Sequence, residues 1–142
     1  MAILRRCAAC FLVCFVVAGA VAPAMGSDRG FPFDQELMLD AAPTRGAKRV
    51  PILEIEGDGA ASIDLWCQSL RGEARVSAGS ITIVPRSEPM PEPTRAMPCS
   101  PARQARDENL LAALSGVTSW RRRGDIIELF GTTTLRFHLM TN

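Results

Sequence analysis

Short segments with alternating apolar residues follow one another along most of the chain and predict β-strands. The first lies within residues 35–43, where Leu37 and Leu39 share one face before Pro43. The segments on either side of Gly57-Asp58-Gly59 predict a hairpin, and Ala78-Gly79 predicts a second one. Residues 117–130 predict a strand, a turn at 123–125 and another strand. A last strand within 131–140 has Leu135, Phe137 and Leu139 inward, and Arg136 and His138 outward.

A helical period replaces this alternation after Cys99. Ser100 is a candidate N-cap, Pro101 suits the first turn, and Ser115-Gly116 ends the helix. The expected apolar face contains Leu110, Leu111 and Leu114, and the expected solvent face contains Arg103, Arg106, Asp107 and Glu108.

Five prolines between Pro85 and Pro98 interrupt both patterns. Proline cannot donate to a strand ladder and breaks a helix interior, so we predict a long loop over residues 85–98. A surface excursion is favoured, and a proline-motif ligand is the alternative. The hairpin-connected strands, about seven or eight, and the single helix predict an α+β domain. In it the helix packs on a curved or partly closed, cracked-barrel-like antiparallel sheet.

The first 24 residues resemble a secretory signal peptide. Arg5 and Arg6 precede an uncharged apolar run over residues 7–21, and small residues allow cleavage after Ala24 or Gly26. A membrane anchor is the alternative, but about 15 apolar residues fall short of the roughly 20 that a spanning helix needs. We therefore expect a periplasmic or secreted protein with one domain over residues 25–142, no remaining transmembrane segment and a monomeric state.

Removal of this leader changes the charge and cysteine counts. Two of the 16 basic residues lie in it, which leaves 14 basic against 15 acidic residues and argues against general nucleic-acid binding. Of the five cysteines, the three at positions 7, 10 and 14 also leave, so Cys67 and Cys99 remain. An even pair in an exported chain predicts a disulfide.

Cys99 stands directly before the predicted helix, where a thiol could be activated as a nucleophile. The one histidine, His138, could act as its base, so an enzyme using Cys99 or His138 is the alternative to the disulfide. The disulfide is favoured because the second cysteine and an oxidising compartment support it. The sequence has no serine-hydrolase or phosphate-binding motif and too few zinc ligands, so we predict no catalytic, metal or cofactor site.

The remaining polar and aromatic candidates have two interpretations each. The carboxylate pairs Glu54/Glu56 and Asp107/Glu108 are interpreted as solvated faces rather than acid–base pairs. Trp66 and Trp120 are expected to pack in the core or at its rim rather than bind sugars. The arginine run at positions 121–123 either binds an anionic partner such as lipid headgroups or, as favoured, guards a strand edge.

The order of these motifs resembles the META domain, the HslJ-like family of bacterial envelope proteins. Trp66-Cys67 comes at a strand end, Met97-Pro98-Cys99 precedes the helix "DENLLAAL", and "VTSWRRRGDIIELFG" and "TLRFHL" follow. The resemblance is good over residues 65–139 and looser over residues 33–64. The chain departs from the family pattern where Gln68 replaces an asparagine, Pro98 replaces an alanine and Thr94 is displaced by one position.

The resemblance implies a fold similar to a cracked-barrel lipoprotein that pilots secretins and binds lipid. Family members are exported or outer-membrane-associated and linked to stress or novobiocin resistance, and the family supplies no catalytic residues. We therefore predict a non-enzymatic periplasmic protein with a binding or envelope-maintenance role, whose partner is an envelope protein or a lipid. A carrier of a lipid or small apolar ligand in the sheet cavity is the alternative.

Overall fold

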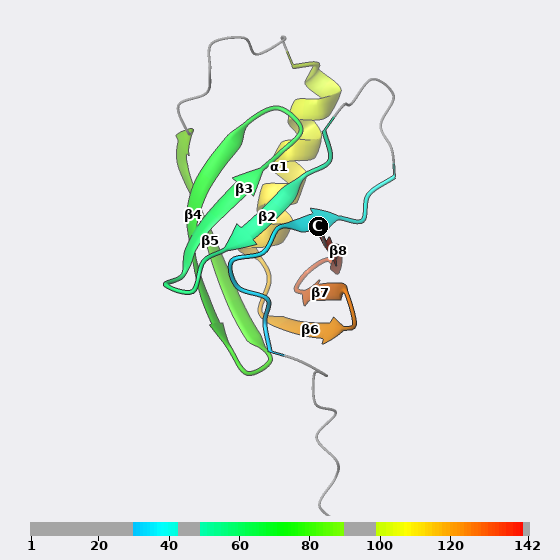
Figure 1. Ribbon diagram of the computed structural model, residues 1–142. Helices are drawn as coiled ribbons and strands as arrows, with labels where there is room; N and C mark the ends of the chain where they lie inside the picture. Colours follow the sequence, from blue (N-terminus) through cyan, green and yellow to red (C-terminus); the bar gives the residue numbers. More distant parts are fainter. Residues whose placement is uncertain (1–29, 43–48, 90–98, 141–142) are drawn as a thin grey trace, which may run out of the picture.

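The computed structural model describes residues 30–42, 49–89 and 99–140. Within these ranges the chain forms eight strands and one helix (Figure 1). The strands are β1 (Leu37–Leu39), β2 (Ile52–Ile55), β3 (Ala60–Asp64), β4 (Ser69–Ser77), β5 (Ser80–Pro89), β6 (Ser119–Arg123), β7 (Ile126–Phe130) and β8 (Leu135–Leu139). The helix α1 (Pro101–Ser115) lies between β5 and β6 in the sequence. The predicted leader and most of the predicted proline-rich loop lie outside the described residues.

The strands form an antiparallel sheet in which the spatial order follows the sequence order. β1 also pairs with β8, with Leu37 opposite Leu139 and Leu39 opposite Phe137, so the sheet closes into a barrel. The predicted antiparallel sheet with one principal helix is confirmed. The sheet, which was predicted to be curved or partly closed, is a closed barrel. Because β1 pairs with both β2 and β8, neither the first nor the last strand has a free edge.

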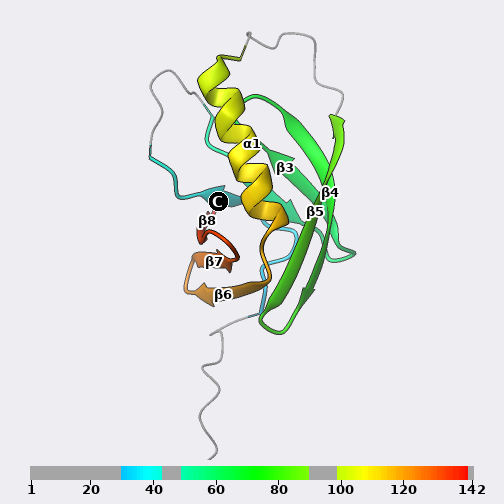
Figure 2. The ribbon, with the colours of Figure 1, turned by 180° about the vertical axis from the view of Figure 1, so that it is seen from behind.

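The barrel wall is weakest between β5 and β6. Among the described residues, these strands are joined by a single register pair, Ser80 opposite Ser119. Ile81 donates its backbone N–H to the carbonyl of Thr118 at 3.1 Å, and Trp120 donates to that of Gly79 at 3.1 Å. Beyond these bonds the two strands diverge, and α1 lies across the opening (Figure 2). The helix therefore completes the wall that β5 and β6 leave open.

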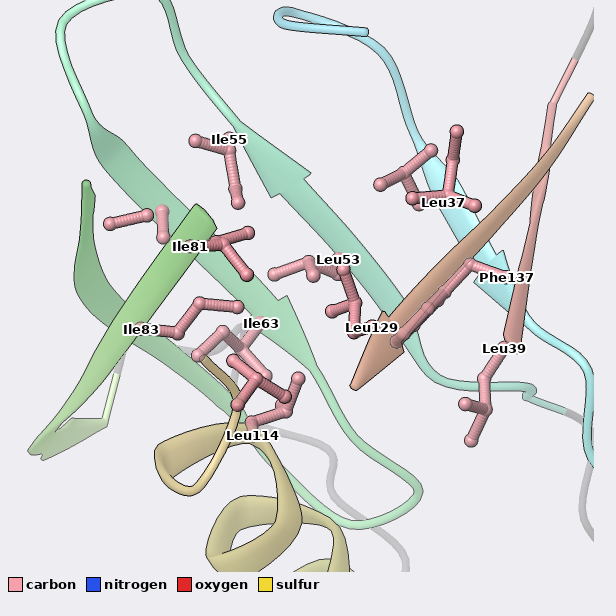
Figure 3. Close-up of a cluster of buried hydrophobic side chains, with 14 of the residues drawn as sticks. Leu37, Leu39, Leu53, Ile55, Ile63, Ile81, Ile83, Leu114, Leu129 and Phe137 are labelled. Carbon is pink, nitrogen blue, oxygen red and sulfur yellow. The ribbon is translucent and has the colours of Figure 1, made fainter. Parts of the chain in front are cut away.

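Apolar side chains from every strand and from α1 fill the barrel (Figure 3). Leu114 of α1 points toward Ile63 and Ile83, and all three side chains are almost fully buried. Leu110 is buried beside it on the same helix, whereas Leu111 packs partly exposed against the core. Each fully buried side chain of this size stabilises the fold by about 1.5–3 kcal/mol, so α1 is part of the core and not an accessory.

Strand β5 continues through the first part of the predicted proline-rich loop, so the prediction that no strand passes Pro85 is wrong. Pro85 lies opposite Gly72, and the pairing with β4 extends to Pro89 opposite Leu70 after a register shift. Because N–H directions alternate along a strand and Ile81 points its N–H toward β6, position 85 faces the same side. β6 has already diverged there, so the missing N–H of proline costs the ladder nothing.

The two tryptophans pack as predicted. Trp120 is buried, its ring meets that of Phe31 edge-on at 5.1 Å, and its indole N–H donates to the carbonyl of Ser77 at 2.9 Å. Trp66 is partly buried against the core. Both aromatic rings therefore contribute packing, and Trp66 also forms part of the site described next.

Candidate functional site

A disulfide joins Cys67, in the turn between β3 and β4, to Cys99, which lies just before α1. This is the pair predicted from the sequence, and its Cα atoms are 5.6 Å apart across 32 residues. The turn itself is closed by a hydrogen bond of 2.8 Å from the N–H of Leu65 to the carbonyl of Gln68. In the disulfide, Cys99 has no thiolate to offer as a nucleophile.

Asp107 brings a buried carboxylate from α1 to the same turn, with only 2% of the residue exposed. Its Oδ1 accepts the backbone N–H of Trp66, and its Oδ2 accepts that of Cys67, each at 3.0 Å. Burial raises the pKa of Asp107, and the two hydrogen bonds and the positive charge of Arg103 offset this only in part. The helix therefore holds the turn through an ionisable group as well as through the disulfide.

The interpretation of Asp107 and Glu108 as a solvated pair is wrong for Asp107, although Glu108 is exposed. Asp107 lies three residues before Leu110 and seven before Leu114, and this spacing places all three on one face of the helix. Its charge suggested the solvent side, whereas the helical period pointed to the core side. The period was therefore the signal that could have identified this residue.

Contacts around the helix start complete this site. Ser100 is the N-cap residue, as predicted, and its backbone is extended. Its side chain makes no capping hydrogen bond and instead accepts a hydrogen bond from Nε of Arg103 at 3.3 Å. The guanidinium of Arg106 lies 5.8 Å from the centre of the Trp66 ring, within range of a cation–π contact. We call the unit formed by Trp66, Cys67, Cys99 and Asp107 the clasp.

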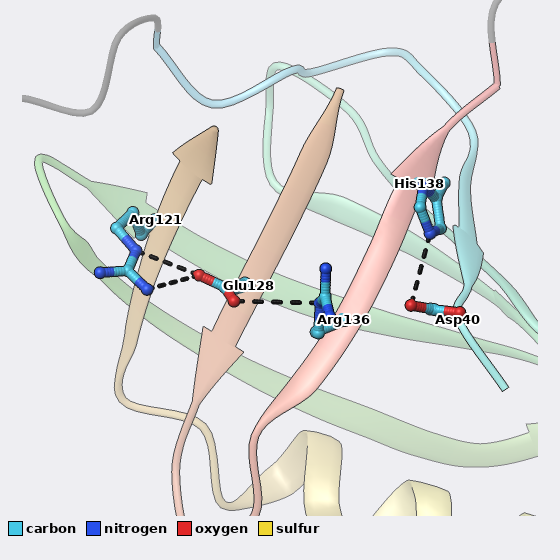
Figure 4. A network of polar contacts seen from close by, with 5 residues as sticks. All are labelled: Asp40, Arg121, Glu128, Arg136 and His138. Carbon is cyan, nitrogen blue, oxygen red and sulfur yellow. Dashed lines mark hydrogen bonds and ion pairs between the residues drawn. The ribbon is translucent and has the colours of Figure 1, made fainter. Parts of the chain in front are cut away.

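A second polar group lies on the outer surface of β6, β7 and β8 (Figure 4). The sheet register places Arg121 opposite Glu128, and Glu128 opposite Arg136. Oε2 of Glu128 accepts hydrogen bonds from Nε and Nη2 of Arg121 at 3.1 and 2.6 Å, and Oε1 lies 3.9 Å from Nε of Arg136. The hydrogen bonds from Arg121, together with the positive charges of Arg121, Arg123 and Arg136, hold the pKa of Glu128 below its ordinary value.

His138 points outward on β8, as predicted, and its Nε2 lies 3.4 Å from Oδ2 of Asp40 (Figure 4). Both side chains are nearly half exposed. Within the described part of the chain no contact joins His138 to Cys99, whose sulfur is bonded to Cys67. The structure therefore does not bring the two candidate catalytic residues together.

Two members of the arginine run make contacts within the domain. Arg121 pairs with Glu128 and lies 5.2 Å from the centre of the Phe130 ring. Arg122 donates to the carbonyl of Gly124 at 2.9 Å and to that of Gly30 at 3.4 Å. Arg123 is exposed at the strand end. These contacts favour a structural interpretation of the run over a site for an anionic partner.

The described residues also bear on metal and membrane sites. They contain no group of three or more His, Cys, Asp or Glu side chains placed to hold a metal ion. In the same ranges, no helix has both the length and the apolar character to cross a membrane.

Comparison with known proteins identifies the family. The family model of the META domain matches residues 35–141, a span that includes all the strands and the helix described above. The chain belongs to the META domain family. The resemblance recognised from the motif order is thereby confirmed. A search of curated proteins finds no match to this META domain.

Two solved structures share the fold of this META domain. The NMR structure of a protein from Burkholderia xenovorans has a TM-score of 0.54 and 18% sequence identity, and the match covers 85% of this chain and 98% of the other. A second NMR structure has a TM-score of 0.52 and 20% identity, with 74% and 88% of the two chains covered. At these identities the likeness concerns the fold alone.

Of the three departures from the family pattern, only Gln68 lies within the described residues. It is exposed in the clasp turn, and its carbonyl accepts the N–H of Leu65. The backbone of Gln68 thus closes the turn of this META domain, and a backbone contact of this kind does not depend on the side chain. Thr94 and Pro98 lie outside the described residues.

Proposed function

We propose that this META-family protein is exported and acts without catalysis, as a binding protein of the bacterial cell envelope. The observation that carries the proposal is the disulfide between Cys67 and Cys99. Structural disulfides persist in oxidising compartments and are rare in the cytosol. The signal-like leader over residues 1–24 supports the same location.

A role without catalysis is supported by the state of the candidate nucleophile and base. Nucleophilic catalysis by cysteine needs a thiolate and a nearby base. Cys99 is bonded to Cys67, and His138 contacts Asp40 on the outer surface of the barrel. On the outer face of β6, β7 and β8, the carboxylate of Glu128 is paired with Arg121 and Arg136.

Binding at the outer surface is favoured over transport of a ligand inside the barrel. The interior contains almost fully buried apolar side chains from all around the sheet (Figure 3). Interiors packed in this way leave little space for a guest. The outer face of β6, β7 and β8 instead presents charged groups held in fixed positions by the Arg121–Glu128–Arg136 contacts, and a partner protein of the envelope with complementary charges is the occupant that suits it.

Thiol trapping in the native host tests the export proposal. Cells are quenched with acid, free thiols are labelled with a maleimide of high mass, and the mature chain is followed on gels. We expect no label without reductant and two labels with it. The Cys67→Ser variant, which leaves Cys99 unpaired, should take one label and shows that the reagent has access. Two labels on the unreduced wild-type chain would contradict the proposal.

Two further measurements test the mode of action. A His138→Ala variant is expected to complement any phenotype of a deletion strain as fully as wild type does. A loss of complementation by a folded variant would support the enzyme alternative.

Native mass spectrometry of gently purified protein is expected to give the bare chain mass. A lipid adduct that survives purification would favour the carrier alternative.

A further inference from the structure

A disulfide and a pair of hydrogen bonds join the same two segments of the clasp, the turn between β3 and β4 and the segment that contains Cys99 and α1. Cys67 is bonded to Cys99 at the start of α1, and its N–H is also held by Asp107 further along that helix. The N–H of the preceding residue, Trp66, is held by the same carboxylate. The clasp turn is therefore fixed to α1 by its backbone as well as by its sulfur.

The backbone connection places Cys67 where the disulfide needs it. Disulfides usually join residues whose Cα atoms lie about 4.4–6.8 Å apart, and here they are 5.6 Å apart. Asp107 fixes the peptide units on the N-terminal side of Trp66 and Cys67, and it lies on the helix that follows Cys99. Neither hydrogen bond involves a sulfur atom, so both can exist in the dithiol form.

We propose that Asp107 is a positioning residue for the disulfide. Its carboxylate docks the clasp turn on α1 and raises the effective concentration of the Cys67 thiol at Cys99. The sulfur–sulfur bond and the Asp107 hydrogen bonds then reinforce each other, because each orders the segment that the other must hold.

The chemical step is thiol–disulfide exchange with an external disulfide, either a protein disulfide or oxidised glutathione. The thiolate of one cysteine attacks the external disulfide and releases one thiol in a mixed disulfide intermediate. The thiolate of the second cysteine then attacks this intermediate, which forms the Cys67–Cys99 bond and releases the second thiol. The two cysteines lose two protons and two electrons, and the external disulfide gains them.

This coupling matters for the barrel because of where α1 lies. The buried face that contains Asp107 also contains Leu110 and Leu114, which pack into the core. The same helix crosses the opening between β5 and β6 (Figure 2). Closure of the clasp therefore holds in place the element that completes the wall, and oxidation after export would strengthen it. This last point rests on the proposed export, whereas the coupling itself does not.

The test is the equilibrium of the purified chain with glutathione redox buffers at fixed pH. The fraction of Cys67–Cys99 disulfide is measured for wild type, Asp107→Ala, Asp107→Asn and, as the matched control, Glu108→Ala. We expect Asp107→Ala to lower the equilibrium constant for disulfide formation at least tenfold, about 30 mV in reduction potential. Asp107→Asn, which keeps one oxygen acceptor, should lie between Asp107→Ala and wild type. Glu108→Ala should equal wild type.

Equal equilibrium constants for wild type and both Asp107 variants would overturn the proposal. If reduced Asp107→Ala does not fold, the Asp107→Asn constant decides, because a purely structural role would leave the potential of a folded variant at the wild-type value. These measurements use purified protein, so they stand whether or not thiol trapping supports export. An intracellular location would remove the proposed function and leave the coupling between Asp107 and the disulfide testable.

Discussion

Gly131, in the turn between β7 and β8, lies directly against the backbone of Gly116 at the end of α1. A Cβ atom on Gly131 would overlap the carbonyl oxygen of Gly116 and come within 2.9 Å of the Cα of Val117. These neighbours are backbone atoms, so no side-chain rotation can relieve the contact. The close approach seats the C-terminal end of α1 on the barrel.

Gly131→Ala is therefore expected to lower the free energy of unfolding by about 2 kcal/mol or more, within or above the usual range for overpacking. Urea denaturation followed by tryptophan fluorescence measures it. The matched control is Gly30→Ala, because a Cβ at Gly30 meets nothing within 4 Å. It should change the stability by less than about 0.5 kcal/mol. Equal effects of the two substitutions would rule out the proposed close approach.

Removal of the disulfide should also be costly. The chain-entropy model gives a stabilisation of roughly 3–4 kcal/mol for a closed loop of this length, 32 residues in separation. We expect the Cys67→Ser/Cys99→Ser double variant to unfold at a correspondingly lower urea concentration than the oxidised wild type. Wild type in strong reductant serves as the control and should behave like the double variant. Unchanged stability in both would show that the disulfide does not support the fold.

The pH dependence of stability should reveal the burial of Asp107. Because its pKa is raised in the folded state, the native chain binds this proton more tightly than the unfolded chain does. The resulting stabilisation is fully present below the ordinary aspartate pKa, about 3.9, and is lost as the pH rises through the raised value. Asp107→Asn removes this titration. The free energy of unfolding of wild type, taken relative to that of the variant, should therefore fall between pH 3.5 and 7. A difference that grows with pH would contradict the raised pKa.

Glu128 should give the opposite dependence of stability on pH. Its pKa is lowered in the folded state, so it stabilises the fold above the ordinary glutamate pKa, and this contribution is lost as the pH falls through the lowered value. Glu128→Gln should destabilise by about 0.5–1 kcal/mol at pH 7, since the arginine partners are half exposed, and by less at pH 3. Glu54→Gln on β2 is the control and should change the free energy of unfolding at pH 7 by less than about 0.5 kcal/mol. The reverse order of effects would exclude the ion-pair account.

The sequence predicted the local structure and the Cys67–Cys99 disulfide, whereas the pairing of distant strands could not be read from it. Gly57-Asp58-Gly59 and Ala78-Gly79 identified two hairpins because a turn and its flanking alternation lie within a few residues. Closure of the barrel requires β1 to pair with β8, as it does at Leu37 opposite Leu139. The alternation of apolar and polar residues shows which face of the sheet a residue occupies, but it does not show which distant strand that residue will pair with. The sheet was therefore predicted, and its closure was not.

The missed clasp residue has a related cause. The negative charge of Asp107 predicts a position in solvent, because carboxylates are almost never buried without partners. Its partners are the backbone N–H groups of Trp66 and Cys67, 41 and 40 residues away. Every residue except proline has a backbone N–H, so the amino-acid sequence does not show which of them act as hydrogen-bond donors to a buried carboxylate. Only the spacing of Asp107 from Leu110 and Leu114 in the sequence pointed to the buried face.

Pro85 has a consequence for association between molecules. On the side of β5 that β6 leaves open, a strand edge would ordinarily offer a row of N–H groups to a strand of another chain. Pro85 faces that side and has no N–H, so the row is interrupted where the wall is open. With α1 across the same opening (Figure 2), this part of the barrel is a poor template for edge-to-edge pairing with a strand of another chain.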